Sequence, residues 1–267
     1  MCSVFDVSTS AFYASLKRST APDFGLVREA IRSIQSESDR TYGYRRMVPE
    51  LQSQGIRCGK KLAMRLMLEE GLQGRLKRTK PYGKPGNAEV PTVPNELDRK
   101  FGVGAPNRVW VSDITYIATR SGWVYLAVVL DLYARVVVGW SVSITPDTRL
   151  VLAALASAIK TRQPGRGVMM HTDQGCQYTS MAWRARLELL GFRQSMSGRG
   201  QCWDNAPMES WNGILKRESR VVTTLRNDVD EVREVLFRWI EGWYNTRRRH
   251  SGNGYASPAE YERNWAA

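Results

Sequence analysis

The sequence predicts an α/β protein: a mixed five-stranded sheet with flanking helices, a helical region before the sheet, and a helical basic tail after it. Three observations lead to this fold class. Residues 108–143 contain three β-rich runs separated by short turn segments. Residues 146–197 then alternate between helical and strand patterns, which is how helices come to cover the faces of a sheet. In the rest of the chain, apolar residues recur mainly at helical spacing.

Size, charge and cysteine usage limit the classes of protein to which the chain can belong. With 267 residues, of which 42% are hydrophobic, it can bury a sizeable core, and we expect one main domain with smaller attachments. A net charge of +13 favours a polyanionic partner, either nucleic acid or an anionic membrane face. No apolar run approaches the roughly 20 residues that a membrane-spanning helix needs, and the N-terminus lacks the features of a signal peptide. We therefore expect DNA or RNA as the partner, and no membrane. The 4 cysteines form no CxxC pair, which indicates reduced thiols in a cytoplasm rather than a zinc site.

The first part of the chain, residues 1–80, has the pattern of a helical, helix-turn-helix-like DNA-binding region. Short helical segments are predicted at residues 7–18, 23–38, 44–55 and 60–72. In the last of them, Leu62, Leu66 and Met67 lie toward one face, and Gly71 ends the helix. Lys and Arg outnumber Glu in this region, which is compatible either with a solvated helical face or with DNA contact. We take the second interpretation, with candidate contacts at Arg45, Arg46, Lys60, Lys61 and Arg65. A Pro- and Gly-rich stretch follows, and we expect residues 81–100 to form an extended linker.

The most strongly patterned block, residues 101–222, contains the predicted sheet. Its first three runs, 108–117, 122–132 and 134–143, should form an antiparallel meander. A helix is expected from about Pro146, with Thr145 as its N-cap, followed by a buried strand at 168–172. A helix from about Ser180 to Leu190, ended by Gly191, leads to a fifth strand at 192–197. This order of elements is the layout of a ribonuclease-H-like core.

Two further helices complete the expected architecture. One begins at Asn205 or Ala206, and its Met208, Trp211 and Leu215 recur at packing positions, whereas Glu209, Asn212, Gly213 and Lys216 occupy a different stripe. The second lies in the C-terminal part, residues 223–267, where apolar residues between Val229 and Trp243 predict an amphipathic helix. It runs into a basic tail whose candidate DNA contacts are Arg247, Arg248 and Arg249.

Three carboxylates in this framework are candidates for a catalytic metal site. Asp113 lies in a strand pattern, Asp173 ends a buried strand, and Glu209 stands in the first turn of a helix. Carboxylates packed together repel one another, so such a cluster makes sense mainly around a cation. Phosphodiester chemistry commonly uses two divalent ions about 3.5–4 Å apart, and Mg²⁺ prefers oxygen ligands, with Mn²⁺ as a plausible substitute. In this hypothesis Asp113 bridges two Mg²⁺ ions, and Asp173 and Glu209 each hold one of them.

Each of these carboxylates also has a structural interpretation. Asp113 could cap a backbone amide, Asp173 could serve a turn before glycine, and Glu209 could favour the N-terminus of its helix. Among neighbouring polar residues, we expect structural roles for Asp131, Asp204 and His171. Asn205 could either order the site or cap the helix.

Several sequence motifs resemble those of a known family. WVSDITYI, VVLDLYARVVVGWSVS, HTDQGCQYTS and WDNAPMESWNGILKRE are similar to the integrase core of DDE transposases, specifically to the second-frame product (OrfB) of the insertion-sequence-three family. TYGYRR and GKKLAMRLMLEEGL resemble the family's N-terminal helix-turn-helix region, and WYNTRRRHSGNGYASPAEYE resembles its C-terminal signature, so the resemblance covers nearly the whole chain. The spacing of 35 residues between Asp173 and Glu209 is a hallmark of the family. The resemblance implies that Asp113, Asp173 and Glu209 form the catalytic triad. It also implies that Lys216, two turns after Glu209, is the family's basic residue on the same helix face.

The chain departs from the family pattern in its tail, where Arg249 and Asn253 stand in place of the usual proline and leucine. These positions concern the packing of the tail and leave the triad unchanged.

The resemblance carries further expectations about activity and partners. It implies a DNA transposase that hydrolyses the DNA at the ends of a mobile insertion sequence to free a 3′-hydroxyl. This hydroxyl then attacks another phosphodiester directly, with no covalent protein intermediate. Expected partners are double-stranded DNA, both terminal inverted repeats and target, and further copies of the chain, at least a dimer on DNA. A first-frame partner (OrfA) is also expected, and the protein should be cytoplasmic and associated with the bacterial nucleoid. Two alternatives stay open: a catalytically silent DNA-binding subunit or regulator that needs the first-frame product, and a ribonuclease-H-like nuclease without joining activity.

Overall fold

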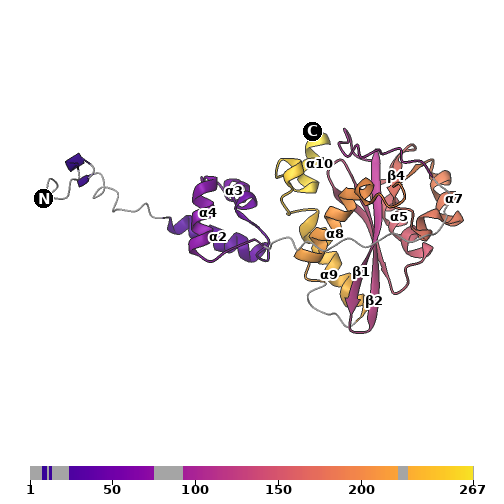
Figure 1. The fold of residues 1–267 in the computed structure, drawn as a ribbon, viewed down its shortest axis with the longest axis horizontal. Coiled ribbons are helices and arrows are strands. Elements are labelled where there is room, and N and C mark those ends of the chain that lie inside the picture. The colour runs from indigo at the N-terminus through magenta and orange to yellow at the C-terminus, as the bar shows by residue number, and fades with distance from the viewer. Residues whose placement is uncertain (1–7, 11, 14–23, 75–92, 222–227, 267) are drawn as a thin grey trace. The chain divides into compact units, whose positions relative to one another are not determined.

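A computed structural model describes residues 8–10, 12–13, 24–74, 93–221 and 228–266 of the chain (Figure 1). The chain divides into two compact units, Met1–Arg75 and Leu76–Ala267. Most of the helix expected at residues 7–18 and most of the expected linker lie outside the described residues. None of the helices in the described part of the chain is long and apolar enough to cross a membrane.

The first unit contains three of the predicted helices. They are α2 (Gly25–Glu37), α3 (Tyr44–Ser53) and α4 (Lys60–Glu69). Their apolar stripes meet in a small core formed by Ile31, Ile34, Met47, Val48, Leu51, Ala63, Leu66 and Met67. Arg28 and Arg32 on α2 form ion pairs with Glu70 at the end of α4, with N···O distances of 3.0 and 2.7 Å. Gly71 adopts a left-handed conformation (φ +65°) just beyond Glu70, the C-cap of α4, which confirms the predicted end of that helix.

The second unit is built on the predicted mixed five-stranded sheet. The strands are β1 (Val109–Thr119), β2 (Gly122–Asp131), β3 (Val136–Ser143), β4 (Met169–Thr172) and β5 (Arg193–Met196). Their order is β3-β2-β1-β4-β5, so that β1 is the central strand. The first three strands form the antiparallel meander that the sequence predicts, and β4 and β5 join it in parallel.

Helices cover both faces of the sheet (Figure 1). On one face, α5 (Thr148–Arg162), α6 (Cys176–Thr179) and α7 (Met181–Leu190) pack on residues such as Trp110, Val129 and Met170. On the other face, α8 (Ala206–Glu218) and α9 (Val229–Trp239) pack on Val111, Val128 and other residues. This second face carries the site that is described below.

The start of α5 differs from the prediction. The helix begins at Thr148, and its N-cap is Asp147, whose Oδ1 accepts the N–H of Leu150 at 3.1 Å. The expectation of Thr145 as N-cap and Pro146 in the first helical position was therefore wrong, because the aspartate two residues further on satisfies the helix amides. The start and end of α7 were predicted correctly: the Oγ of Ser180 caps it, and Gly191 ends it with φ +67°.

The C-terminal part of the chain packs on the sheet unit. The helix α9 continues into a π-helical segment, η3 (Ile240–Tyr244), and a short 3₁₀ turn, η4 (Ser251–Asn253), precedes α10 (Pro258–Ala266). The amide of Asn253 donates to the carbonyl of Ala134 at 2.8 Å, and the guanidinium of Arg249 donates to the carbonyl of Tyr255 and to Glu260. Of the two residues that depart from the family pattern, Asn253 thus bonds the tail to the turn between β2 and β3, and Arg249 bonds the tail to itself.

Candidate active site

The central strand β1 presents Asp113 toward helix α8. One carboxylate oxygen, Oδ1, accepts the N–H of Ile114 at 2.8 Å. The other, Oδ2, accepts the side-chain amide of Asn212 on α8 at 2.7 Å. Asp113 is only partly exposed, since the helix covers it from one side. The polar stripe of α8 therefore faces this carboxylate, whereas its apolar stripe, Met208, Trp211 and Leu215, is buried.

Strand pairing brings Asp173 next to Asp113. The parallel strands β1 and β4 pair Val111 with His171, and each aspartate stands two residues further along its own strand direction. Neighbouring strands lie about 4.8 Å apart, so the register sets the two residues side by side. Asp173 immediately follows β4, stays exposed on one side, and accepts the N–H of Gly175 through Oδ1 at 3.0 Å.

Both aspartates are costly to ionise where they lie. Burial raises the pKa of Asp113 to about 7, with Asp173 contributing further, and the Ile114 N–H, the Asn212 amide and Lys216 oppose the increase. The pKa of Asp173 is also raised, because the surrounding protein displaces water from around its carboxylate. Carboxylates held in this way favour either a proton or a cation between them. Two close carboxylates are oxygen ligands of the kind that hard divalent ions prefer, so the residues present fit such an ion.

Glu209, the third candidate, lies in the first turn of α8 with its side chain exposed. It precedes Asn212 by three residues and thus shares the side of the helix that faces Asp113. However, no three His, Cys, Asp or Glu side chains within the described ranges lie close enough to hold a metal ion together. The structure therefore brings two of the three candidate carboxylates together and leaves Glu209 outside the pair. Lys216, two turns along the same helix, is exposed, and its charge acts on Asp113.

Sequence reasoning assigned no role to Asn212 and left that of Asn205 open. The sequence feature that could have identified Asn212 is its helical spacing, which places it on the same face of α8 as Glu209. Asn205 makes no side-chain bond to cap α8, and its buried amide instead donates to the carbonyl of Ser112 at 3.2 Å. Of the two interpretations of Asn205, the structure therefore favours the ordering of the site, because this bond ties the start of α8 to the residue before Asp113.

The rival polar residues have structural contacts. Asp131 is fully buried and accepts the backbone N–H groups of Asn107 and Tyr133 at 2.7 and 3.0 Å. Asp204 accepts the N–H of Gly198 at 2.9 Å and pairs with Arg99. The ring of His171 is buried between the hydroxyls of Ser195 and Ser197, and burial lowers its pKa to about 4. These contacts agree with the structural roles expected of all three residues.

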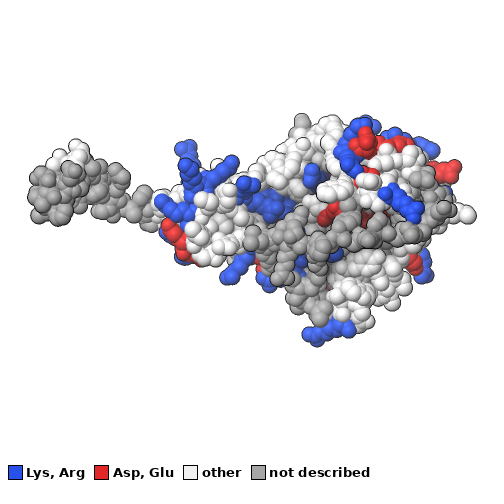
Figure 2. Space-filling view, in the orientation of Figure 1, with Lys and Arg blue, Asp and Glu red and all other residues white. Residues whose placement is uncertain are grey.

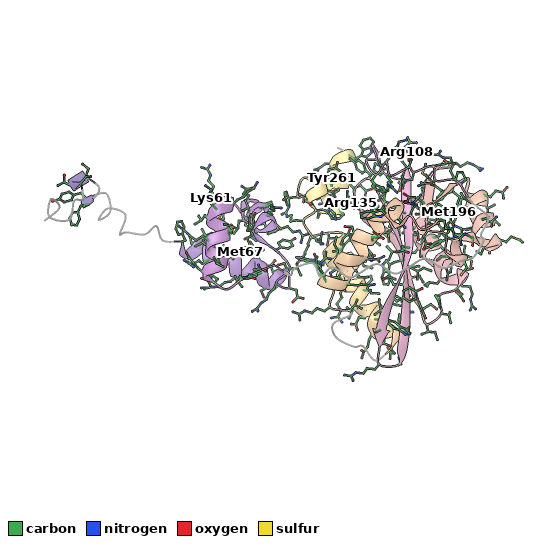
Figure 3. All side chains as sticks on the ribbon, in the orientation of Figure 1. Lys61, Met67, Arg108, Arg135, Met196 and Tyr261 are labelled. Atoms are coloured by element: carbon green, nitrogen blue, oxygen red, sulfur yellow. The ribbon has the colours of Figure 1, made fainter. Side chains whose placement is uncertain are left out.

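The candidate DNA contacts of the first unit cluster at the N-terminal ends of two helices. Arg45 and Arg46 open α3, and Lys60 and Lys61 open α4, with Arg65 one turn later. All except Arg46 are exposed, and Figure 3 shows that Lys61 extends outward from the unit. Lys and Arg side chains project from the visible face of this unit (Figure 2). Contact with DNA by these residues stays a prediction.

One candidate DNA contact in the tail requires correction. Arg248 is fully buried, and its Nε and Nη2 bond both carboxylate oxygens of Glu218 on α8 at 2.6 and 2.9 Å. A buried guanidinium that is bonded in this way cannot reach a DNA phosphate, so the expected DNA contact was wrong for Arg248. The side chain instead ties the tail to α8. Arg247 is exposed, whereas Arg249 is partly buried beside Glu260.

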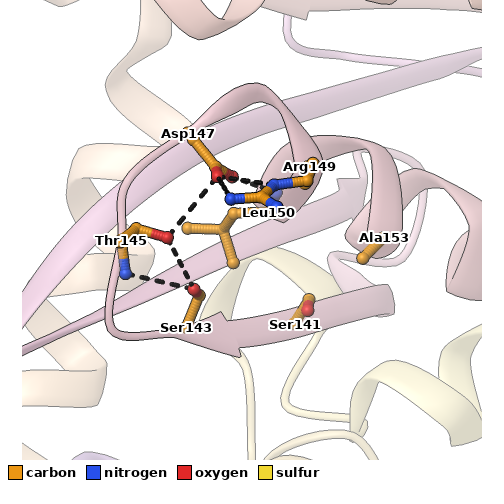
Figure 4. A pocket seen from close by; sticks show the side chains of 7 residues that line it. All are labelled: Ser141, Ser143, Thr145, Asp147, Arg149, Leu150 and Ala153. Atoms are coloured by element: carbon orange, nitrogen blue, oxygen red, sulfur yellow. Dashed lines mark hydrogen bonds and ion pairs between the residues drawn. The ribbon is translucent and has the colours of Figure 1, made fainter.

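A hollow lies at the start of α5, on the other face of the sheet from the aspartates (Figure 4). It has a volume of about 210 Å³ and is lined by Ser141, Ser143, Thr145, Asp147, Arg149, Leu150 and Ala153. Its one carboxylate, that of Asp147, caps the helix and pairs with Arg149. The hollow therefore lacks the paired carboxylates that distinguish the site on β1 and β4.

Comparisons with known proteins agree with this fold. Family models described as an integrase core domain match residues 104–202 and 190–258, and a model described as an HTH-like domain matches residues 25–80. The chain is 38% identical to an uncharacterized 31 kDa protein of insertion element IS600 from Shigella sonnei, over 98% of this chain and 97% of that protein. It is 35% identical to the transposase InsF of insertion sequence IS3A from Escherichia coli K12, over 98% of this chain and 92% of the relative. A solved simian T-cell lymphotropic virus intasome has a similar fold, with a TM-score of 0.50 and 15% identity over 87% of this chain and 74% of that one.

Proposed function

This chain belongs to the IS3 family of insertion-sequence transposases with an integrase core, and we propose that it is a DNA transposase. In this proposal it cleaves DNA strands at the ends of a mobile insertion sequence and joins the freed 3′-hydroxyl ends to other DNA. The observation that carries the proposal is the proximity of Asp113 on β1 and Asp173 directly after the adjacent strand β4, beside the polar stripe of α8.

We propose Asp113, Asp173 and Glu209 as the catalytic and metal-binding carboxylates. Bound divalent ions, Mg²⁺ in the first place and Mn²⁺ as a substitute, would activate the attacking oxygen and stabilise the leaving oxygen of the phosphodiester. The raised pKa of Asp113 supports this role, because a carboxylate that is costly to ionise alone gains most from a neighbouring cation. Glu209 would join the pair by rotation of its exposed side chain, which starts one helical turn before Asn212.

The residues around the carboxylates have separate tasks in this mechanism. Asn212 holds one oxygen of Asp113, which fixes the orientation of the carboxylate before substrate arrives. Asn205 fixes the start of α8 against the carbonyl of Ser112. Lys216 provides a positive charge near the pair and would attract the phosphate backbone beside the scissile bond.

The partners follow from the proposed reaction. Terminal inverted repeats and target DNA would bind through basic side chains, including those at the N-terminal ends of α3 and α4 and the exposed Arg247, largely by phosphate contacts. Because two ends of an element must be held together, we propose that at least two copies of the chain assemble on DNA. A first-frame product would be a further partner, and the site of action would be the cytoplasm, on the bacterial nucleoid.

A strand-cleavage and strand-transfer assay tests the proposal. Its substrate is duplex DNA copied from both ends of the insertion sequence that carries the gene, and it is run with Mg²⁺ or Mn²⁺. We expect Asp173→Asn to reduce product formation at least about a hundredfold, because a lost metal ligand removes several kcal/mol of transition-state stabilisation. The asparagine can still accept the N–H of Gly175, so the fold is preserved. Parental rates from Asp173→Asn would refute the proposal.

The same assay separates the alternatives. One alternative is a subunit that is silent until a first-frame partner is present. Joined products that form only after addition of the first-frame product would support that alternative. Nicked DNA that never yields joined products would instead indicate a nuclease without joining activity.

A further inference from the structure

The segment between β5 and α8, residues 198–204, borders the aspartate pair. This segment, the 198–204 loop, ends in a short 3₁₀ helix, η2 (Cys202–Asn205), which carries Trp203. At its start, the carbonyl of Ser197 accepts the side-chain amide of Gln174, the residue after Asp173, at 3.0 Å. At its end, the amide of Asn205 donates to the carbonyl of Ser112, the residue before Asp113, at 3.2 Å. The two flanking residues of the loop are thus bonded to the immediate neighbours of the two aspartates.

The base of the 198–204 loop is held in one conformation. Asp204 accepts the N–H of Gly198 through Oδ2 at 2.9 Å and the guanidinium of Arg99 through Oδ1 at 2.7 Å. Arg99 also donates to the side chain of Gln201 at 3.1 Å. Gly200 has a left-handed conformation, with φ +69°. Since Asp204 is buried and closes the loop, the residues between Gly198 and Asp204 are presented on a fixed support.

Trp203 is exposed at this position. Its exposed fraction is 68%, whereas the next two residues, Asp204 and Asn205, are only 4% and 6% exposed. Arg199 in the same loop is also exposed. An exposed indole and a cationic side chain in one short segment are groups that bind single-stranded nucleic acid, where bases stack on aromatic rings and the backbone is attracted by positive charge.

We propose that Trp203 stacks on an unpaired nucleobase at a DNA end held beside the aspartates, and that Arg199 contacts a phosphate of the same strand. This inference rests on the proposed function, which supplies DNA as the substrate. An unpaired base is the favoured occupant because its flat face is free, whereas inside a duplex the neighbouring bases cover it. A second protein is the less favoured occupant, because Trp203 is the only large apolar side chain in the sequence 198–204, where its neighbours are Gly, Arg, Gln, Cys and Asp.

Fluorescence of a modified DNA end tests the inference directly. The probe is a synthetic element-end duplex with a single-stranded overhang that carries 2-aminopurine, mixed with the full chain in the absence of divalent ions so that no cleavage occurs. We expect the parent protein to quench the probe by stacking. Trp203→Ala should abolish the quenching and weaken binding of the overhang about 5- to 150-fold, since a base stacked on an aromatic ring contributes about 1–3 kcal/mol. Trp203→Phe should retain most of the quenching, because a ring is kept.

Trp123 provides a matched control. It is 58% exposed and lies near the turn between β1 and β2, so Trp123→Ala removes an indole of similar exposure elsewhere on the same unit. This control should quench and bind like the parent. Because Trp203 is exposed, its alanine variant should unfold at the parental temperature, which circular dichroism checks.

Two results would overturn the inference. One is quenching by Trp203→Ala equal to that of the parent. The other is a change confined to self-association in sedimentation velocity, which would indicate a contact between copies. Failure of the proposed function has a different signature: a parent protein that forms no cleaved or joined products with Mg²⁺, whatever Trp203 does to the probe.

Discussion

The substitution Asp113→Asn should stabilise the protein in the absence of divalent ions, although it removes a proposed catalytic group. The pKa of Asp113 is raised from its ordinary value of 3.8 to about 7 in the folded chain. Between these two pH values the folded protein keeps a proton that the unfolded chain has released. The free energy of unfolding therefore falls as pH rises from about 4 to about 7, and above pH 7 the loss is complete. Asparagine carries no such penalty.

The magnitude follows from the same values. At about 1.36 kcal/mol per pH unit, the interval from 3.8 to about 7 corresponds to a ceiling of about 4 kcal/mol. Against this gain, an asparagine at position 113 accepts hydrogen bonds through one oxygen only, so it cannot serve both the N–H of Ile114 and the amide of Asn212. A mismatch of this kind costs about 1–3 kcal/mol. We expect a net stabilisation of about 1–3 kcal/mol at pH 8 and none at pH 4.

Urea unfolding of the parent and Asp113→Asn, at pH 4 and at pH 8 and with a chelator present, measures the effect. The raised pKa of Asp131 gives both proteins the same additional pH dependence, so it cancels in the difference. Addition of Mg²⁺ or Mn²⁺ at pH 8 should stabilise the parent and not the variant. If the two proteins lose stability equally between pH 4 and pH 8, the electrostatic account of the site is refuted.

Two further predictions concern packing. Gly139→Ala should lower the free energy of unfolding by about 1–3 kcal/mol, because the added Cβ would lie 2.4 Å from a backbone nitrogen of α5. The control Gly165→Ala, whose added Cβ would have no atom within 4 Å, should have little effect in urea unfolding. Equal unfolding midpoints of the two variants would contradict the prediction. Arg248→Met should cost about 3–5 kcal/mol by leaving the buried carboxylate of Glu218 without its guanidinium partner, whereas the exposed Arg247→Met should change stability by less than about 0.5 kcal/mol. A loss no larger than that of the Arg247 control would show that the buried ion pair does not stabilise the tail.

The sheet could be predicted because its pattern is local. Alternating apolar residues and turn segments identified all five strands, and Gly191 and Ser180 marked the ends of α7. The start of α5 was missed because Thr145 and Asp147 are both good caps in sequence, and only the geometry decides which of them reaches the helix amides.

Contacts between residues far apart in the sequence could not be predicted from local patterns. Arg248 looks like its neighbours in a basic tail, and its burial depends on Glu218, which lies 30 residues earlier on another element. The proximity of Asp113 and Asp173 follows from the register of two parallel strands, which no local pattern specifies. Asn212 could be placed on the face of Glu209 from helical spacing, but its bond to Asp113 depends on how α8 packs across β1.

The central claim is that three carboxylates act together on DNA. The role of Glu209 is the part of this claim that most needs a test, because its side chain lies outside the aspartate pair. The most direct measurement is the rate of Mg²⁺-dependent strand transfer at element-end DNA for Glu209→Gln, compared with Glu188→Gln, which alters an exposed glutamate on α7. The account predicts a loss of at least about a hundredfold for Glu209→Gln and parental rates for Glu188→Gln. Strand transfer by Glu209→Gln at the parental rate would contradict it.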